Sequence, residues 1–324
     1  MARIKFKKEF EELIYKVEIE AFITETSNVA IYQRIANRIR EVEPTKILLA
    51  KEIERKLVDK LSNNDNMLNV YRNYLPPETT TMLKEVISNN GKVGEAFKDY
   101  LPIKIIADDL NNSIKNKLKT PLIITVLITF FMNGLLNGFD EMIHDPTLEV
   151  NSRAIFVAEN YLYIVFPILL VIGLIVFKKP SWIFGVKKVL KKIESLMVCT
   201  TTLSLSKNSL PSSAIITFLR QTYKMNKVPL KGSKIKDLSM LLYRYKHITL
   251  LEDSALANVT FTEFQLIPLL EEIVSNRKKE ALMLGEVIGD FISNISTILL
   301  VIPFTIAIYP IATAMMKLMS IINI

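Results

Sequence analysis

Three stretches of the chain carry no charged side chain, and they alternate with two long segments that mix apolar and charged residues. The uncharged stretches are residues 120–139, 160–177 and 291–316, which contain 20, 18 and 26 residues. A bilayer core about 30 Å thick needs about 20 mostly apolar helical residues. The pattern therefore predicts transmembrane helices over 120–139, 160–177 and 293–316. It argues against an ordinary soluble enzyme and against a disordered chain.

The mixed segments show helical periodicity. In residues 4–22 the apolar side chains recur every three or four positions and form one face of a helix; they are Phe6, Phe10, Leu13, Ile14 and Val17. This face has two possible roles, packing within its own domain or docking onto a cytoplasmic partner. Residues 46–61 repeat the pattern, and breaks are expected at Pro44, 62–66, Pro76-Pro77 and 89–91. The predicted fold class is all-α, with bundles of short helices outside the membrane.

The distribution of charge predicts the topology. The net charge is +8, made of +3 in residues 1–119, −4 in residues 140–160, +8 in residues 178–293 and Lys317. Lys and Arg near the ends of transmembrane helices mark the cytoplasmic side. We therefore expect cytoplasmic helical domains at 1–119 and 178–292, a short outer loop at 140–159 and an outer C-terminal end at 317–324. No basic stripe with interleaved aromatic residues favours nucleic-acid binding.

The sequence offers little reactive chemistry. Cys199 is the only cysteine, and the two histidines, His144 and His247, are far apart, so neither a disulfide nor a His/Cys metal site is expected. Nine glycines form no phosphate-binding loop. The acidic pairs at 108–109, 252–253 and 271–272 offer oxygen ligands for a divalent cation, but neighbouring carboxylates on a helix diverge, and solvated surface is favoured. We predict no catalytic, cofactor-binding or metal-binding residues.

A weak internal repeat appears when the chain is shifted by 185 residues. Pro76-Pro77-Glu78 then falls on Phe261-Thr262-Glu263, Asn90-Gly91-Lys92 on Ser275-Asn276-Arg277, and Glu95-Ala96-Phe97 on Glu280-Ala281-Leu282. Gly and Asn are the residues that best tolerate a left-handed backbone at a helix end. The repeat predicts helix caps at Gly91 and Asn276, and two duplicated helical-bundle domains.

This layout resembles the inner-membrane platform proteins of type IV pilus and type II secretion systems, the F-type secretion domain family. Leu75-Pro76-Pro77 and the segment 90–97 resemble the family's repeated pattern, as do their counterparts in the second copy, and 205–211 resembles the turn after its first helix. The family's Gly-Glu pair is replaced by Ile87-Ser88 and Glu272-Ile273, which leaves in doubt any role of that glutamate. The short first domain suits a diverged branch such as the type IVb pili.

The resemblance implies a non-enzymatic platform in the bacterial inner membrane, with a cytoplasmic N-terminus and a periplasmic C-terminus. Its implied partners are a hexameric cytoplasmic ATPase, pilin or pseudopilin subunits, other inner-membrane alignment proteins, membrane lipid and further copies of the chain. Expected partner contacts are the face of residues 4–22 described above and the basic residues Lys187, Lys188, Lys191 and Lys192. Two alternatives stay open, an oligomeric transporter or channel subunit and a membrane-bound enzyme acting on lipid or peptide. A transporter is disfavoured because no charged residue lies deep within a span.

Overall fold

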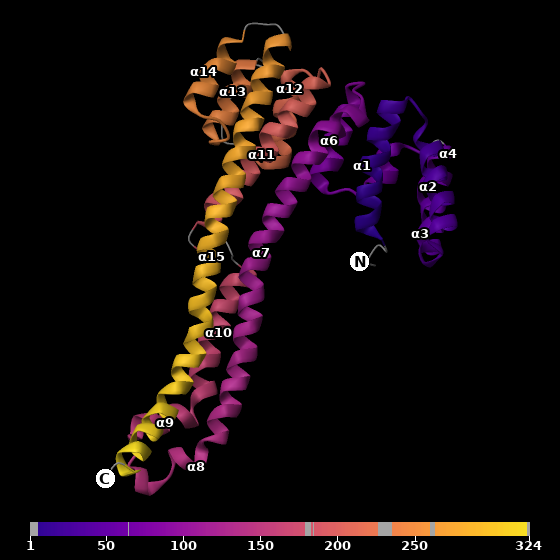
Figure 1. Ribbon diagram of the computed structural model, residues 1–324. Helices are drawn as coiled ribbons and strands as arrows, with labels where there is room; N and C mark the ends of the chain where they lie inside the picture. The colour runs from indigo at the N-terminus through magenta and orange to yellow at the C-terminus, as the bar shows by residue number, and fades with distance from the viewer. Residues whose placement is uncertain are drawn as a thin grey trace. The chain divides into compact units, whose positions relative to one another are not determined.

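The computed structural model describes residues 6–63, 65–178, 183, 185–225, 235–259 and 263–322, which form helices joined by turns and loops (Figure 1). No strand occurs among those residues, so the predicted all-α class is confirmed for them. The α-helices are α1 (Lys7–Thr24), α2 (Asn28–Val42), α3 (Ile47–Ile53), α4 (Asp59–Ser62), α5 (Met67–Tyr71), α6 (Pro77–Ser88), α7 (Val93–Gly138), α8 (Asp140–Ile143), α9 (Ser152–Glu159), α10 (Tyr161–Lys178), α11 (Val186–Lys207), α12 (Ser212–Tyr223), α13 (Ile235–Arg244), α14 (Leu250–Asn258) and α15 (Glu263–Ile322).

In the first half of the chain, helices end or begin at the predicted breaks Pro44, Pro76-Pro77 and 89–91. Pro44 opens a short 3-10 turn, Pro44–Lys46, and Pro77 is the first residue of α6. Proline is tolerated there because the first N–H groups of a helix have no intrahelical partner. Residues 46–61 form α3 and α4 with a π-helical turn, Glu54–Val58, between them.

Two helices are long and apolar enough to cross a membrane, and a third span is possible. α7 extends for 46 residues and includes the uncharged stretch 120–139 almost entirely. α15 extends for 60 residues and includes the stretch 291–316. α9 and α10 meet at a bend of 60° and pass the same test only as a pair. The described part of the chain thus has two or three candidate membrane-spanning helices.

The chain folds into two compact units, each built from two separate segments. Unit 1 contains residues 1–107 and 194–279, and unit 2 contains residues 108–193 and 280–324. α7, α11 and α15 contribute residues to both units. The two segments predicted as separate cytoplasmic domains therefore contribute most of their residues to a single compact body.

The core of unit 1 is rich in aromatic side chains. Tyr15 of α1 is buried, packs edge-on against Phe97 of α7 with ring centroids 4.9 Å apart, and shares a hydrogen bond with Thr79 at 2.9 Å. The absence of a side chain at Gly94 makes this crossing possible, because a Cβ there would overlap the backbone carbonyl group of Glu18 and the Cβ of Phe22 on α1. Helix α7 therefore lies close against α1.

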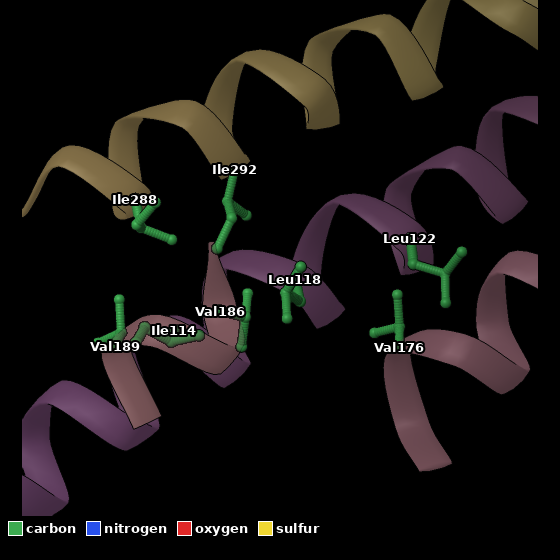
Figure 2. Packing of buried hydrophobic residues seen from close by; sticks show 8 residues of the cluster. All are labelled: Ile114, Leu118, Leu122, Val176, Val186, Val189, Ile288 and Ile292. Atoms are coloured by element: carbon green, nitrogen blue, oxygen red, sulfur yellow. The ribbon is translucent and has the colours of Figure 1, made fainter. Parts of the chain in front are cut away.

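Unit 2 has two apolar clusters along its helices. One contains eight side chains of α7, α10, α11 and α15; they are Ile114, Leu118, Leu122, Val176, Val186, Val189, Ile288 and Ile292. Figure 2 shows Ile288 and Ile292 of α15 pointing toward the valines of α11, while Val176 of α10 faces Leu122 of α7. The second cluster includes Tyr161, whose hydroxyl donates to the carbonyl oxygen of Pro303 at 3.1 Å.

Candidate functional site

The apolar face of α1 belongs to the core of unit 1. Phe10, Ile14 and Val17 are fully buried, and Phe10 stacks on Tyr74 with ring centroids 4.6 Å apart and planes 17° from parallel. Phe6 and Leu13, the other two residues of this face, are partly buried. Of the two roles open for this face, the structure shows packing within the unit, and the three buried side chains offer no surface to a partner.

The basic residues predicted as a partner contact lie at the start of α11 in unit 2. Lys187, Lys188 and Lys191 are exposed. Lys192 is half-exposed, and its Nζ lies 2.5 Å from Oε2 of Glu280 on α15. Since Val186 and Val189 of the same helix belong to the apolar cluster, these ammonium groups border that cluster.

Lysines of α7 and α10 border the same cluster. Lys115, Lys117 and Lys119 alternate with the buried Ile114 and Leu118. The Lys117 side chain lies over Gly289 of α15, where a Cβ would overlap its ammonium group. We call the whole group the lysine collar: Lys115, Lys117, Lys119, Lys178, Lys187, Lys188, Lys191 and Lys192. The collar places positive charge at one end of the apolar segments of unit 2.

The predicted helix cap at Gly91 corresponds to a real helix end, but the left-handed residue is its neighbour. Asn90 has φ of 58°, and the Gly91 N–H donates to the Val86 carbonyl oxygen at 2.8 Å, which closes α6 in a Schellman-type turn. The same geometry recurs at Ser209, where Leu210 N–H donates to Leu205 O at 3.2 Å, and at Lys246.

The prediction of a helix cap at Asn276 is wrong, because α15 continues through that residue without a break. Residues 269–284 contain no Gly or Pro, and Asn in a helix interior costs at most about 0.7 kcal/mol. The next residue, Arg277, is buried and held by the His247 carbonyl oxygen. The repeat's starting residues Phe261 and Thr262 lie outside the described residues.

Residues 205–211, which resemble a turn of the platform family, join the two segments of unit 1. The Asn208 side-chain oxygen accepts from Lys92 N–H at 2.8 Å, and the Ser204 hydroxyl donates to the Ala96 carbonyl oxygen at 2.8 Å. Lys207 lies between Asp99 of α7, at 3.1 Å, and Glu271 of α15, at 2.8 Å. Partial burial opposes the charge on Lys207, but hydrogen bonds from it to Glu271 and Asp99 prevail and raise its pKa. Lys207 therefore ties α7 and α15 together inside unit 1.

A second polar network surrounds the end of α13. The His247 carbonyl oxygen accepts from Arg277 Nε at 2.9 Å and from the Ser195 hydroxyl at 2.8 Å, and Arg277 also pairs with Glu252. Burial, together with the nearby Arg277 charge, lowers the pKa of His247 from 6.5 to about 4. Glu252 thus has a partner inside unit 1, which differs from the sequence-based prediction of a solvated pair at 252–253. Among the residues described, no cluster of three His, Cys, Asp or Glu side chains has the geometry of a metal site.

Sequence reasoning missed a buried carboxyl group in unit 1. Glu18 is 4% exposed, and its Oε1 accepts from the Tyr71 hydroxyl at 2.5 Å and from Asn28 Nδ2 at 2.7 Å. The Tyr71 and Tyr32 hydroxyl groups lie 3.0 Å apart. Burial raises the pKa of Glu18 from 4.5 to about 7, although the hydrogen bonds from Tyr71 and Asn28 act in the opposite direction. A signal was present, since Glu18 follows Ile14 by four residues on the apolar face of α1.

Comparisons of this chain with protein-family models, with curated proteins and with solved structures found no match.

Proposed function

We propose that the chain is a non-enzymatic assembly platform of the bacterial inner membrane. In this proposal α7, the α9–α10 pair and α15 anchor it, the N-terminus is cytoplasmic and the C-terminus periplasmic. Unit 1 meets a hexameric cytoplasmic ATPase, whose nucleotide cycle moves the platform. That movement raises pilin or pseudopilin subunits from the bilayer into a fibre, in pilus biogenesis or in type II secretion. The partner supplies the energy, so the platform needs no nucleotide site of its own.

The observation that carries the proposal is the arrangement at Lys207. α7 and α15 both hold candidate membrane spans, and both begin in unit 1. Within that unit the Lys207 ammonium group contacts Asp99 of α7 and Glu271 of α15. A force applied to unit 1 would therefore act on both helices together. Further support comes from the resemblance of the domain order and of the 205–211 turn to the platform family.

The test is to delete the gene in its own host, image the cell surface for fibres and measure pilin levels and secreted proteins. Loss of fibres or of secretion at normal subunit levels, restored by a plasmid copy, is the expected result. Co-purification from cross-linked cells should then recover an ATPase with the tagged chain.

A matched pair of plasmid variants sharpens this experiment. Lys207→Glu reverses the charge between α7 and α15, and fibre assembly should fall although the protein still inserts in the membrane. Lys46→Gln removes only an exposed pair with Glu43, and assembly should be unchanged. Normal fibres and normal secretion in the deletion strain would refute the platform function, and ion flux through purified chain in liposomes would then favour a transporter.

A further inference from the structure

Unit 2 contains an apolar cavity of about 250 Å³. It lies near the lysine collar, at the same end of the helices. Its lining is entirely aliphatic and includes Leu118 of α7, Ile175 of α10 and both Ile292 and Leu299 of α15. The cavity is smaller than the roughly 300–1,000 Å³ of common small-molecule sites. Ile175 and Leu299 are partly exposed, so the cavity opens at the apolar surface of the helices. These features suit one flexible hydrocarbon chain and exclude a free polar anion.

Lysines outnumber acidic residues in the segments that contain or flank the lining residues of this cavity. Segments 110–119, 178–193 and 280–290 together contain nine lysines and three acidic residues, Glu280, Glu286 and Asp290. Glu280 is already paired with Lys192. Lys187 and Lys188 lie in the first turn of α11, which carries no acidic residue and whose dipole also favours an anion. Val186, next to them, packs in the same cluster as Leu118 and Ile292, which line the cavity.

We propose that unit 2 binds one molecule of anionic phospholipid, with an acyl chain in the aliphatic cavity and its phosphate group at Lys187 and Lys188. The aliphatic lining selects a lipid over a soluble phosphate, and the ammonium groups at the start of α11 select an anionic headgroup over a zwitterionic one. This assigns to the lipid the lysines that sequence reasoning gave to a protein partner. The inference needs only that the chain lies in a membrane, and it stands or falls separately from the platform function.

Native mass spectrometry of the detergent-purified full chain tests the proposal. The probes are 1-palmitoyl-2-oleoyl phosphatidylglycerol and the phosphatidylcholine with the same acyl chains, titrated separately. We expect a single phosphatidylglycerol to be retained in preference to phosphatidylcholine. One basic residue near an anionic surface contributes about fivefold in affinity, so Lys187→Gln/Lys188→Gln should lose about 25-fold for phosphatidylglycerol. Phosphatidylcholine binding should change little.

A second variant tests the cavity independently of charge. Ile175→Trp fills the space with a larger side chain and should remove the retained lipid, whereas Leu170→Trp, on an exposed position of the same helix, should not. Lys7→Gln/Lys8→Gln, two exposed lysines of unit 1, is the matched charge control. Each variant is accepted only if its thermal unfolding matches the wild-type chain. Equal retention of both lipids, or wild-type retention by both the Lys187/Lys188 and the Ile175 variants, would overturn the proposal.

Discussion

Gly94 lies in the first turn of α7, where that helix crosses α1. A Cβ at this position would lie 3.0 Å from the Glu18 carbonyl carbon and closer still to the Glu18 carbonyl oxygen and the Phe22 Cβ. Carbon atoms in contact prefer about 3.5–4.0 Å, so Gly94→Ala forces the two helices apart by at least about 0.5 Å. The obstacle is the backbone of α1, which cannot change rotamer.

The energetic cost follows from two opposing effects. Overpacking a core costs typically about 1–3 kcal/mol, and the backbone contact places this site at the upper end. Ala is better than Gly in a helix by about 0.8–1.0 kcal/mol, which offsets part of that cost. The net loss is about 2 kcal/mol, or about 4–8 °C in the melting temperature of a body the size of unit 1.

The chain contains its own reporter for this measurement. Cys199 is the only thiol and is fully buried in unit 1. A fluorogenic maleimide in detergent solution therefore reacts as unit 1 unfolds on heating. Gly134→Ala is the control, because nothing lies within 4 Å of a Cβ at that residue, and its unfolding temperature should not fall. If Gly94→Ala unfolds at the wild-type temperature or above, the close crossing of α1 and α7 is refuted.

Three further predictions concern the stability of unit 1. The first uses the same thiol assay, and the two pH-dependent ones use thermal unfolding followed by circular dichroism, because maleimide reacts with the thiolate and labels slowly in acid. Lys207→Gln should lower the stability of unit 1 by about 1–2 kcal/mol, because it leaves Asp99 and Glu271 without their shared cation. Lys46→Gln, which removes an exposed ion pair, should leave the stability of unit 1 unchanged. Equal effects of the two substitutions would contradict the bridging role of Lys207. Glu18→Gln should make unit 1 more stable above pH 7, by at most roughly 3 kcal/mol. The reason is that the folded state holds the carboxyl proton up to about pH 7 and the unfolded state only to about pH 4.5. A variant that is no more stable than wild type at pH 8 would contradict the raised pKa of Glu18. His247→Leu should become more stable relative to wild type as the pH falls from 6.5 toward 4, since the unfolded wild-type chain takes up a proton there and the buried imidazole does not. A difference between variant and wild type that stays constant over this range would contradict the low pKa.

The elements of the fold could be read from the sequence to a large extent. Proline and the Asn-Gly step gave the breaks around α6, because these residues restrict or free the backbone locally. The uncharged stretches gave the candidate spans, because a bilayer imposes a length on any helix that crosses it. Both signals are local, and local signals survive without knowledge of the tertiary structure.

Which apolar face packs within its own unit and which meets a partner could not be predicted from the sequence. The stripe containing Phe10 and Ile14 is equally apolar whether it packs on its own unit or on a partner. The choice depends on Tyr74, which lies far along the sequence and stacks on Phe10. Similarly, the joining of residues 1–107 with 194–279 depends on Lys207 and Asn208, whose partners are more than 60 residues away. No periodicity encodes such pairs.

The buried groups Glu18 and His247 have opposite effects on the pH dependence of unit 1. Between pH 4.5 and about 7 the folded state binds the Glu18 proton more tightly than the unfolded state does, so this residue makes stability fall as the pH rises. Between about pH 4 and 6.5 the unfolded state binds the His247 proton more tightly, so this residue makes stability rise. The two changes are similar in size and nearly cancel from pH 4.5 to 6.5. The cancellation argues that the buried carboxyl group is not by itself a pH switch for unfolding, and that each slope emerges only when the other residue is replaced.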